Sequence, residues 1–294
     1  MVIKRYLDNS LFEHVKKDFK FLTGMVSRSY GEIDMGLREN YFNLYYRGDS
    51  LAKVDKDSRG YKVEIHEKFA DQPAIEKLVK RDPRTRNIEY KKTGKYVQFR
   101  IPPENLHLFF QKKNLELLEG NIKEINHGEE IAFEQVLITD NLGRKDLIII
   151  DRQVAEKRGQ GQIDLLALYR NSNGSPYQYH FLVIEVKLGH NPELSGKVGE
   201  QIASYINRIN ENIPDYVECY KRNYQQKKEL GLFPEGWPSN IEIEEKVEGL
   251  VVVGAYSIEG EKQIENLKQK REKEKGWNFK ILQIVNKIDL SKAI

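Results

Sequence analysis

The chain contains little cysteine, tryptophan or methionine. It has two tryptophans, three methionines and a single cysteine, Cys219. A single cysteine excludes an internal disulfide and a thiolate zinc cluster. The six histidines lack the spacing of a helical metal pair. We therefore interpret them as surface or packed residues.

The chain also has no long apolar run and no large excess of either basic or acidic residues. The longest apolar runs, at residues 147–150 and 250–255, are far too short to cross a bilayer. Residues 1–8 lack the apolar stretch of a signal peptide. We therefore expect a cytoplasmic protein with no membrane partner. The 48 basic and 45 acidic residues leave a net charge of +3, which neither requires nor excludes a polyanionic partner.

Hydrophobic residues make up 39% of the 294 positions, which is enough to form a sizeable buried core. The first part has a mixed α and β pattern without a catalytic constellation. The expected elements are a hairpin around residues 47–50, a strand at 61–66, helices at 73–81 and from 102, and a basic loop at 81–86. We assign residues 1–118 to a separate α+β module. The boundary to residues 119–294 is expected near Glu119-Gly120.

The second part has a regular order of elements. The apolar periodicity predicts a helix at 122–141, a strand at 147–152, two further strands, a helix at 195–210, a strand at 247–255, a helix at 259–275 and a strand at 279–285. The run at 247–255 is apolar throughout, as in a strand covered on both faces. This order predicts an α/β domain.

The two middle strands, at residues 162–168 and 181–187, each carry charge where a buried strand should carry none. The turn signal at residues 171–176 predicts a hairpin that brings Asp164 alongside Glu185. Glu185 and Lys187 are two positions apart, so they share one face of the strand. Two carboxylates and an ammonium would then converge at the sheet, which is costly unless something binds them. A divalent cation is the simplest ligand.

Three motifs resemble those of the PD-(D/E)XK nuclease superfamily, in its RecB-like and NucS-like branch. They are Gly161-Gln162-Ile163-Asp164, Glu185-Val186-Lys187, and Gln201-Ile202-Ala203-Ser204-Tyr205. The superfamily's Pro-Asp pair is absent, because Gln162-Ile163 precede Asp164. The resemblance covers about residues 122–290. It implies a restriction-endonuclease-like αβββαβ core, with a mixed sheet flanked by helices, behind the N-terminal α+β module.

The resemblance also implies a Mg²⁺- or Mn²⁺-dependent endonuclease that hydrolyses phosphodiester bonds in DNA. Asp164, Glu185 and the Val186 carbonyl would offer hard oxygen ligands to the metal. Lys187 would orient or deprotonate the attacking water, or stabilise developing charge. The superfamily often adds a glutamate from the helix before the first strand, and here Glu134 would either ligand the metal or lie on the helix surface.

The helix after the second motif carries a polar stripe of Lys197, Gln201, Tyr205 and Arg208. In the superfamily, the glutamine and tyrosine organise the site and contact the nucleic-acid backbone. Lys197 and Arg208 would either join that contact or remain ordinary helix surface.

Two further groups of residues have open roles. Tyr216, Tyr220 and Tyr224 form one helical stripe, which we interpret as core packing; the alternative is nucleic-acid stacking. Arg152, Lys157 and Arg158 precede the first acidic motif and are candidates to line the entry to the site.

The alternatives to a DNA endonuclease are a nuclease for single-stranded or branched DNA or for RNA, or a non-cleaving binding or assembly module on the same fold. Restriction, phage defence and DNA repair are all compatible settings. Cutting both strands with one site per chain would require a homodimer or two successive nicks.

Overall fold

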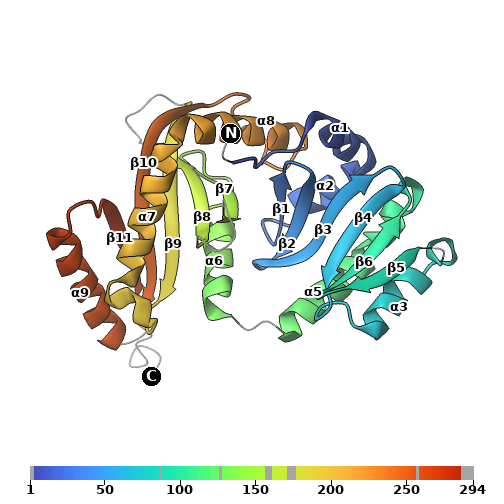
Figure 1. Ribbon diagram of the computed structural model, residues 1–294, viewed down its shortest axis with the longest axis horizontal. Helices are drawn as coiled ribbons and strands as arrows, with labels where there is room; N and C mark the ends of the chain where they lie inside the picture. The colour runs from blue at the N-terminus through green and yellow to red at the C-terminus, as the bar shows by residue number, and fades with distance from the viewer. Residues whose placement is uncertain are drawn as a thin grey trace, which may run out of the picture. The chain divides into compact units, whose positions relative to one another are not determined.

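The computed structural model describes residues 3–86, 88–125, 128–155, 161–170, 177–255 and 258–285. The chain divides into two compact units, each built around its own β-sheet (Figure 1). The first unit holds residues 3–143 and 219–239, and the second holds residues 144–218 and 240–294. The protein is therefore mixed α/β, as expected.

The first unit contains a six-stranded antiparallel sheet in the order β1-β2-β3-β4-β6-β5. Its strands are β1 (Ile33–Arg38), β2 (Tyr41–Tyr46), β3 (Asp49–Asp57), β4 (Gly60–His66), β5 (Glu89–Thr93) and β6 (Tyr96–Ile101). The predicted hairpin is confirmed, because Tyr46 pairs with Asp49 around Arg47 and Gly48. Both turn residues have positive φ, 47° and 87°, as tight hairpin turns that match strand twist require.

Helices supply the rest of the first unit. They are α1 (Asn9–Asp18), α2 (Lys20–Ser27), α3 (Gln72–Lys80), α4 (Leu106–Phe109), α5 (Lys112–Ile125) and α6 (Glu129–Asp140), with short 3₁₀ turns η1 (Pro83–Thr85) and η2 (Pro103–Asn105). The helices predicted at 73–81 and from 102 correspond to α3 and to η2 with α4.

The segment around the expected boundary differs from the prediction. The one helix expected at 122–141 is replaced by α5 and α6, and position 119–120 lies inside α5. Leu115, Leu118 and Ile122 are buried on one stripe of α5 and belong to the apolar core of the first unit. This continuous stripe carries the helix through Glu119-Gly120, because ending it there would expose apolar side chains.

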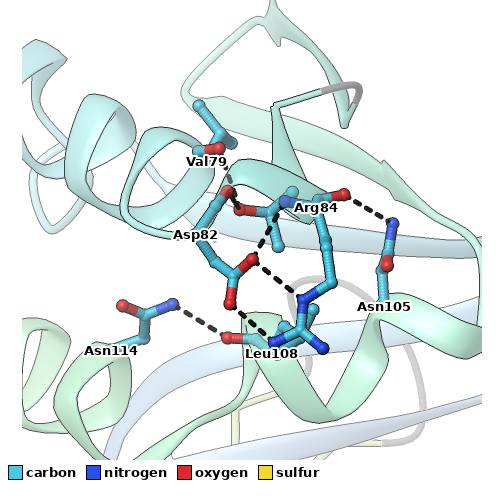
Figure 2. A network of polar contacts seen from close by, with 7 residues as sticks. Val79, Asp82, Arg84, Asn105, Leu108 and Asn114 are labelled. Carbon is cyan, nitrogen blue, oxygen red and sulfur yellow. Dashed lines mark hydrogen bonds and ion pairs between the residues drawn. The ribbon is translucent and has the colours of Figure 1, made fainter.

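The basic loop expected at 81–86 contains an ordered 3₁₀ turn (Figure 2). The Asp82 carboxylate accepts hydrogen bonds from the Arg84 main chain at 2.9 Å and from its guanidinium at 3.0 and 2.8 Å. These bonds lower the pKa of Asp82 to about 2. Thr85 donates its hydroxyl to the carbonyls of Val79 and Asp82. The charge of Arg84 is thus balanced within the turn.

Helix α8 (Ile213–Glu229) begins in the second unit and ends in the first. Tyr216, Tyr220 and Tyr224 are all 0% exposed, which confirms that this stripe is core packing. In the first unit, Gln226 exchanges two 2.8 Å hydrogen bonds with the main chain of Leu7. A side chain of α8 therefore satisfies the backbone N–H and C=O of a residue far away in the sequence.

The second unit contains a five-stranded mixed sheet in the order β11-β10-β9-β8-β7. Its strands are β7 (Leu147–Val154), β8 (Ile163–Tyr169), β9 (Gln178–Leu188), β10 (Glu242–Ala255) and β11 (Phe279–Val285). The pairs β7–β8 and β8–β9 are antiparallel, whereas β9–β10 and β10–β11 are parallel. The strands predicted in this part of the chain are all present.

Three further elements cover or connect this sheet: η3 (Pro192–Ser195), α7 (Lys197–Glu211) and α9 (Ile258–Lys273). Helix α7 lies across β9 and β10 (Figure 1). It approaches closely at Gly249, where an added Cβ would lie 2.7 Å from a methyl group of Ile206. Among the described residues, no helix is both long and apolar enough to cross a membrane.

Candidate active site

The hairpin of β8 and β9 brings the two predicted acids together. Leu165 pairs with Ile184 in antiparallel register, so Asp164 and Glu185 are the next opposed positions on the two strands. Side chains alternate along a strand, so Asp164 and Glu185 share the face of the sheet opposite to that of Leu165 and Ile184. The Asp164 carboxylate accepts a 2.8 Å hydrogen bond from the main-chain N–H of Val186. The predicted convergence of Asp164 and Glu185 is therefore confirmed. The turn signal at 171–176 lies outside the described residues.

Lys187 lies beside Glu185, as the strand periodicity predicts. Its Nζ is 2.9 Å from Glu185 Oε1, and the two residues are 7% and 2% exposed. A charge buried so deeply is costly unless it is paired. The Lys187–Glu185 ion pair therefore compensates part of the charge that the two acids place at the sheet.

A third carboxylate, which the sequence did not single out, also reaches Lys187. Glu193 on η3 has its Oε2 3.5 Å from Lys187 Nζ and its Oε1 in an ion pair with Lys197. The hydrogen bond from Lys197, with the charge of Lys187, holds the pKa of Glu193 below its ordinary value. The only sequence signal for this contact was an acid in a short Pro-initiated turn after the second motif.

Helix α7 brings its tyrosine to the first acidic motif. The Tyr205 hydroxyl donates a 3.1 Å hydrogen bond to the Gln162 carbonyl. Gly161 has a φ of 75°, and a Cβ there would lie 2.9 Å from the same hydroxyl. Burial raises the pKa of Tyr205, and the negative charges of Glu185 and Asp164 raise it further. Tyr205 is thus a neutral phenol held close to both acids.

The other polar residues of α7 have different environments. The Gln201 side-chain oxygen is buried and has no hydrogen-bond partner among the described residues. Arg208 places its guanidinium 5.0 Å from the centre of the Tyr205 ring, a cation–π distance. Lys197 pairs with Glu193 and is otherwise well exposed. A nucleic-acid contact for Tyr205, Arg208 or Lys197 stays a prediction.

The remaining candidates are Glu134, Arg152, Lys157 and Arg158. Glu134 is buried on α6 in the first unit, so its role as a metal ligand stays a prediction. Arg152 is only 1% exposed on β7, and its place at the entry to the site stays a prediction. Lys157 and Arg158 lie outside the described residues.

The oxygen donors of the site suit a hard cation. Asp164 and Glu185 supply carboxylates, and the Val186 carbonyl supplies the type of neutral oxygen that Mg²⁺ and Mn²⁺ also accept. In the part of the chain that the structure describes, no group of three or more His, Cys, Asp or Glu side chains is arranged to hold a metal ion. A cation here would therefore need main-chain or water oxygens besides the two carboxylates.

Comparison of the chain with protein-family models, with curated proteins and with solved structures gave no match. Function must therefore be argued from the site itself.

Proposed function

We propose that the protein is a metal-dependent endonuclease that hydrolyses phosphodiester bonds in DNA. The proposal rests on the proximity of Asp164, Glu185 and Lys187 on the paired strands β8 and β9. Two acids and a lysine beneath a helix bearing Gln201 and Tyr205 correspond to the motifs of the PD-(D/E)XK superfamily. The mixed sheet and its sequence of elements are compatible with the restriction-endonuclease-like core of that superfamily.

In this proposal, Asp164, Glu185 and the Val186 carbonyl hold a Mg²⁺ or Mn²⁺ ion. When bound, such an ion neutralises phosphate charge and lowers the pKa of a water molecule. The Val186 N–H bond to Asp164 orients that carboxylate in advance. Preorganisation of this kind reduces the cost of gathering like charges around a ligand.

Lys187 and Gln201 would act on the water and the phosphate. The Lys187 ammonium can donate to an attacking water or to a phosphoryl oxygen, where negative charge increases in the transition state. The buried Gln201 oxygen is available, within the described structure, to accept a hydrogen bond from a water molecule. Tyr205 holds the Gly161-Gln162 segment that leads into Asp164. It therefore contributes by positioning that strand end.

The proposal is tested by incubating the protein with plasmid DNA and single-stranded DNA in the presence of Mg²⁺ or Mn²⁺. We expect Asp164→Ala and Lys187→Ala to reduce cleavage by roughly 10²-fold or more, since the first removes a metal ligand and the second removes the ammonium that stabilises developing negative charge. Glu261→Ala and Lys262→Ala are matched controls, because both residues are exposed on α9. Equal cleavage by all variants would exclude Asp164 and Lys187 as catalytic residues.

A panel of labelled duplex, flap, mismatch, single-stranded and RNA substrates would then define the substrate. Cleavage of RNA alone would replace DNA as the proposed substrate. Binding of nucleic acid without cleavage of any substrate would favour the alternative of a non-cleaving binding or assembly module. Comparing the oligomeric state of the protein with its nicking or double-strand cutting would distinguish a homodimer from two successive nicks.

A further inference from the structure

The ion pairs around Lys187 extend beyond the predicted motifs. They form a chain in which Glu185, Lys187, Glu193 and Lys197 alternate in charge. Lys187 lies between two carboxylates, with Glu185 at 2.9 Å and Glu193 at 3.5 Å. Only the first of these belongs to the proposed metal ligands. Glu193 lies outside that ligand set, on a different element, the 3₁₀ turn η3.

The turn that carries Glu193 is fixed at several points. Asn191 caps it, its side chain accepting a 2.9 Å hydrogen bond from the Glu193 N–H. Leu194 is fully buried, and Lys270 from α9 donates to the Ser195 carbonyl. Glu193 itself is only 26% exposed at its side chain. Its carboxylate is therefore held near Lys187 by the fold.

A metal ion at Asp164 and Glu185 would change the balance of these contacts. Glu185 cannot give the same oxygen fully to both a divalent cation and the Lys187 ammonium, and the two cations repel each other. Without a second partner, Lys187 would either compete with the metal for Glu185 or leave the site. A carboxylate outside the ligand set removes this conflict.

We propose that Glu193 is a positioning residue that retains Lys187 beside the site while Glu185 binds the metal. This inference rests on the proposed function, because it assumes that Asp164 and Glu185 hold a divalent cation. Glu193 acts through Lys187 and touches neither the metal nor the substrate. Lys197, paired with the other Glu193 oxygen, limits the rotation of that carboxylate.

The test is a calorimetric titration of the full chain with Mn²⁺, without nucleic acid. Glu193→Gln removes a carboxylate that contacts Lys187 from outside the proposed ligand set, so Lys187 should compete more strongly with the metal for Glu185. We expect Mn²⁺ affinity to fall by about 10-fold, the lower end of the range for losing a residue that supports a metal ligand. Glu193→Asp keeps the charge and should recover part of this loss. Glu200→Gln is the matched control, since Glu200 is an exposed acid in the first turn of α7.

A double-mutant cycle with Lys187 separates positioning from general charge. In a Lys187→Gln or Lys187→Met background, Glu193→Gln should change Mn²⁺ affinity by less than about 2-fold, because the residue through which it acts is gone. Thermal unfolding of each variant identifies any that fail to fold, and having two replacements of Lys187 keeps the cycle measurable. An equal loss of affinity in both backgrounds would overturn the inference, since it would reflect only the lost negative charge.

Turnover gives a second readout. Glu193→Gln should lower kcat by about 10-fold while KM for DNA stays within about 3-fold, because Lys187 rather than substrate binding is affected. An unchanged kcat with a raised KM would contradict the assignment. Absence of Mn²⁺ binding by the wild-type chain would instead remove the proposed function, and the inference with it.

Discussion

At the scale of single residues, Gly161 and Tyr205 depend on each other although they come from different motifs. The Tyr205 hydroxyl occupies the space where any side chain at position 161 would begin, and it bonds to the next residue, Gln162. Gly161 also has a positive φ, which residues with a Cβ rarely adopt. Gly161, three residues before Asp164, therefore contacts Tyr205, which lies four residues after Gln201.

We expect Gly161→Ala to destabilise the protein by about 1–3 kcal/mol, through backbone strain and displacement of Tyr205. Tyr205→Phe removes the hydroxyl that the new methyl group would meet. The cost of Gly161→Ala should consequently be smaller in the Tyr205→Phe background. Urea unfolding of the four proteins measures the coupling. Additive costs would show that the two residues do not constrain each other.

At the scale of elements, the distance between α7 and β10 determines where Gln201 and Tyr205 lie relative to the acids. Gly249 on β10 allows Ile206 and Ile202 of α7 to approach the strand, and Phe279 of β11 fills the neighbouring space. The apolar stripe of α7 packs on the sheet, so its polar stripe is presented near the β8–β9 hairpin. Strand and helix therefore position the site together.

Gly249→Ala should raise the separation of α7 from β10, because the added Cβ would lie 2.7 Å from Ile206 and 2.8 Å from Phe279. Overpacking of this kind costs about 1–3 kcal/mol of unfolding free energy. Gly120→Ala is the control: its position on α5 has open space, and alanine should stabilise the helix by up to about 1 kcal/mol. Urea unfolding monitors both. Equal effects of the two substitutions would contradict close packing at Gly249.

At the scale of the whole molecule, the two units cannot be separated by one cut in the chain. The first unit needs residues 219–239, which follow most of the second unit in the sequence. Leu230 joins its apolar core, and Gln226 and Asn223 bond to the main chain of Leu7 and Arg5. Removing this segment would leave core surface and backbone groups without their native partners.

A fragment of residues 1–143 should therefore be several kcal/mol less stable than the first unit in the full chain, since each buried large apolar side chain contributes about 1.5–3 kcal/mol. Attaching residues 213–239 to the fragment through a flexible linker should restore much of that stability. Hydrogen exchange and circular dichroism provide the measurement. A fragment as protected as the full chain would show that the returning segment is dispensable.

Much of the local structure could be predicted from the sequence. The strands at β4, β7, β10 and β11 follow from their apolar patterns, and the pairing of Asp164 with Glu185 and Lys187 follows from strand periodicity and a turn signal. These inferences depend on neighbours in the chain, for which two-residue and 3.6-residue periods are reliable guides.

Contacts between distant segments could not be predicted in this way. The return of α8 to the first unit, the approach of Glu193 to Lys187 and the clash that keeps residue 161 a glycine all depend on how separate elements pack. The boundary expected at Glu119-Gly120 differs from the observed division for the same reason, since burial of the α5 stripe in a shared core outweighs the local helix-breaking tendency of one glycine. The sequence by itself determined which charged residues share a strand face; only the tertiary structure decided which other side chains surround them, because packing joins residues that no periodicity relates.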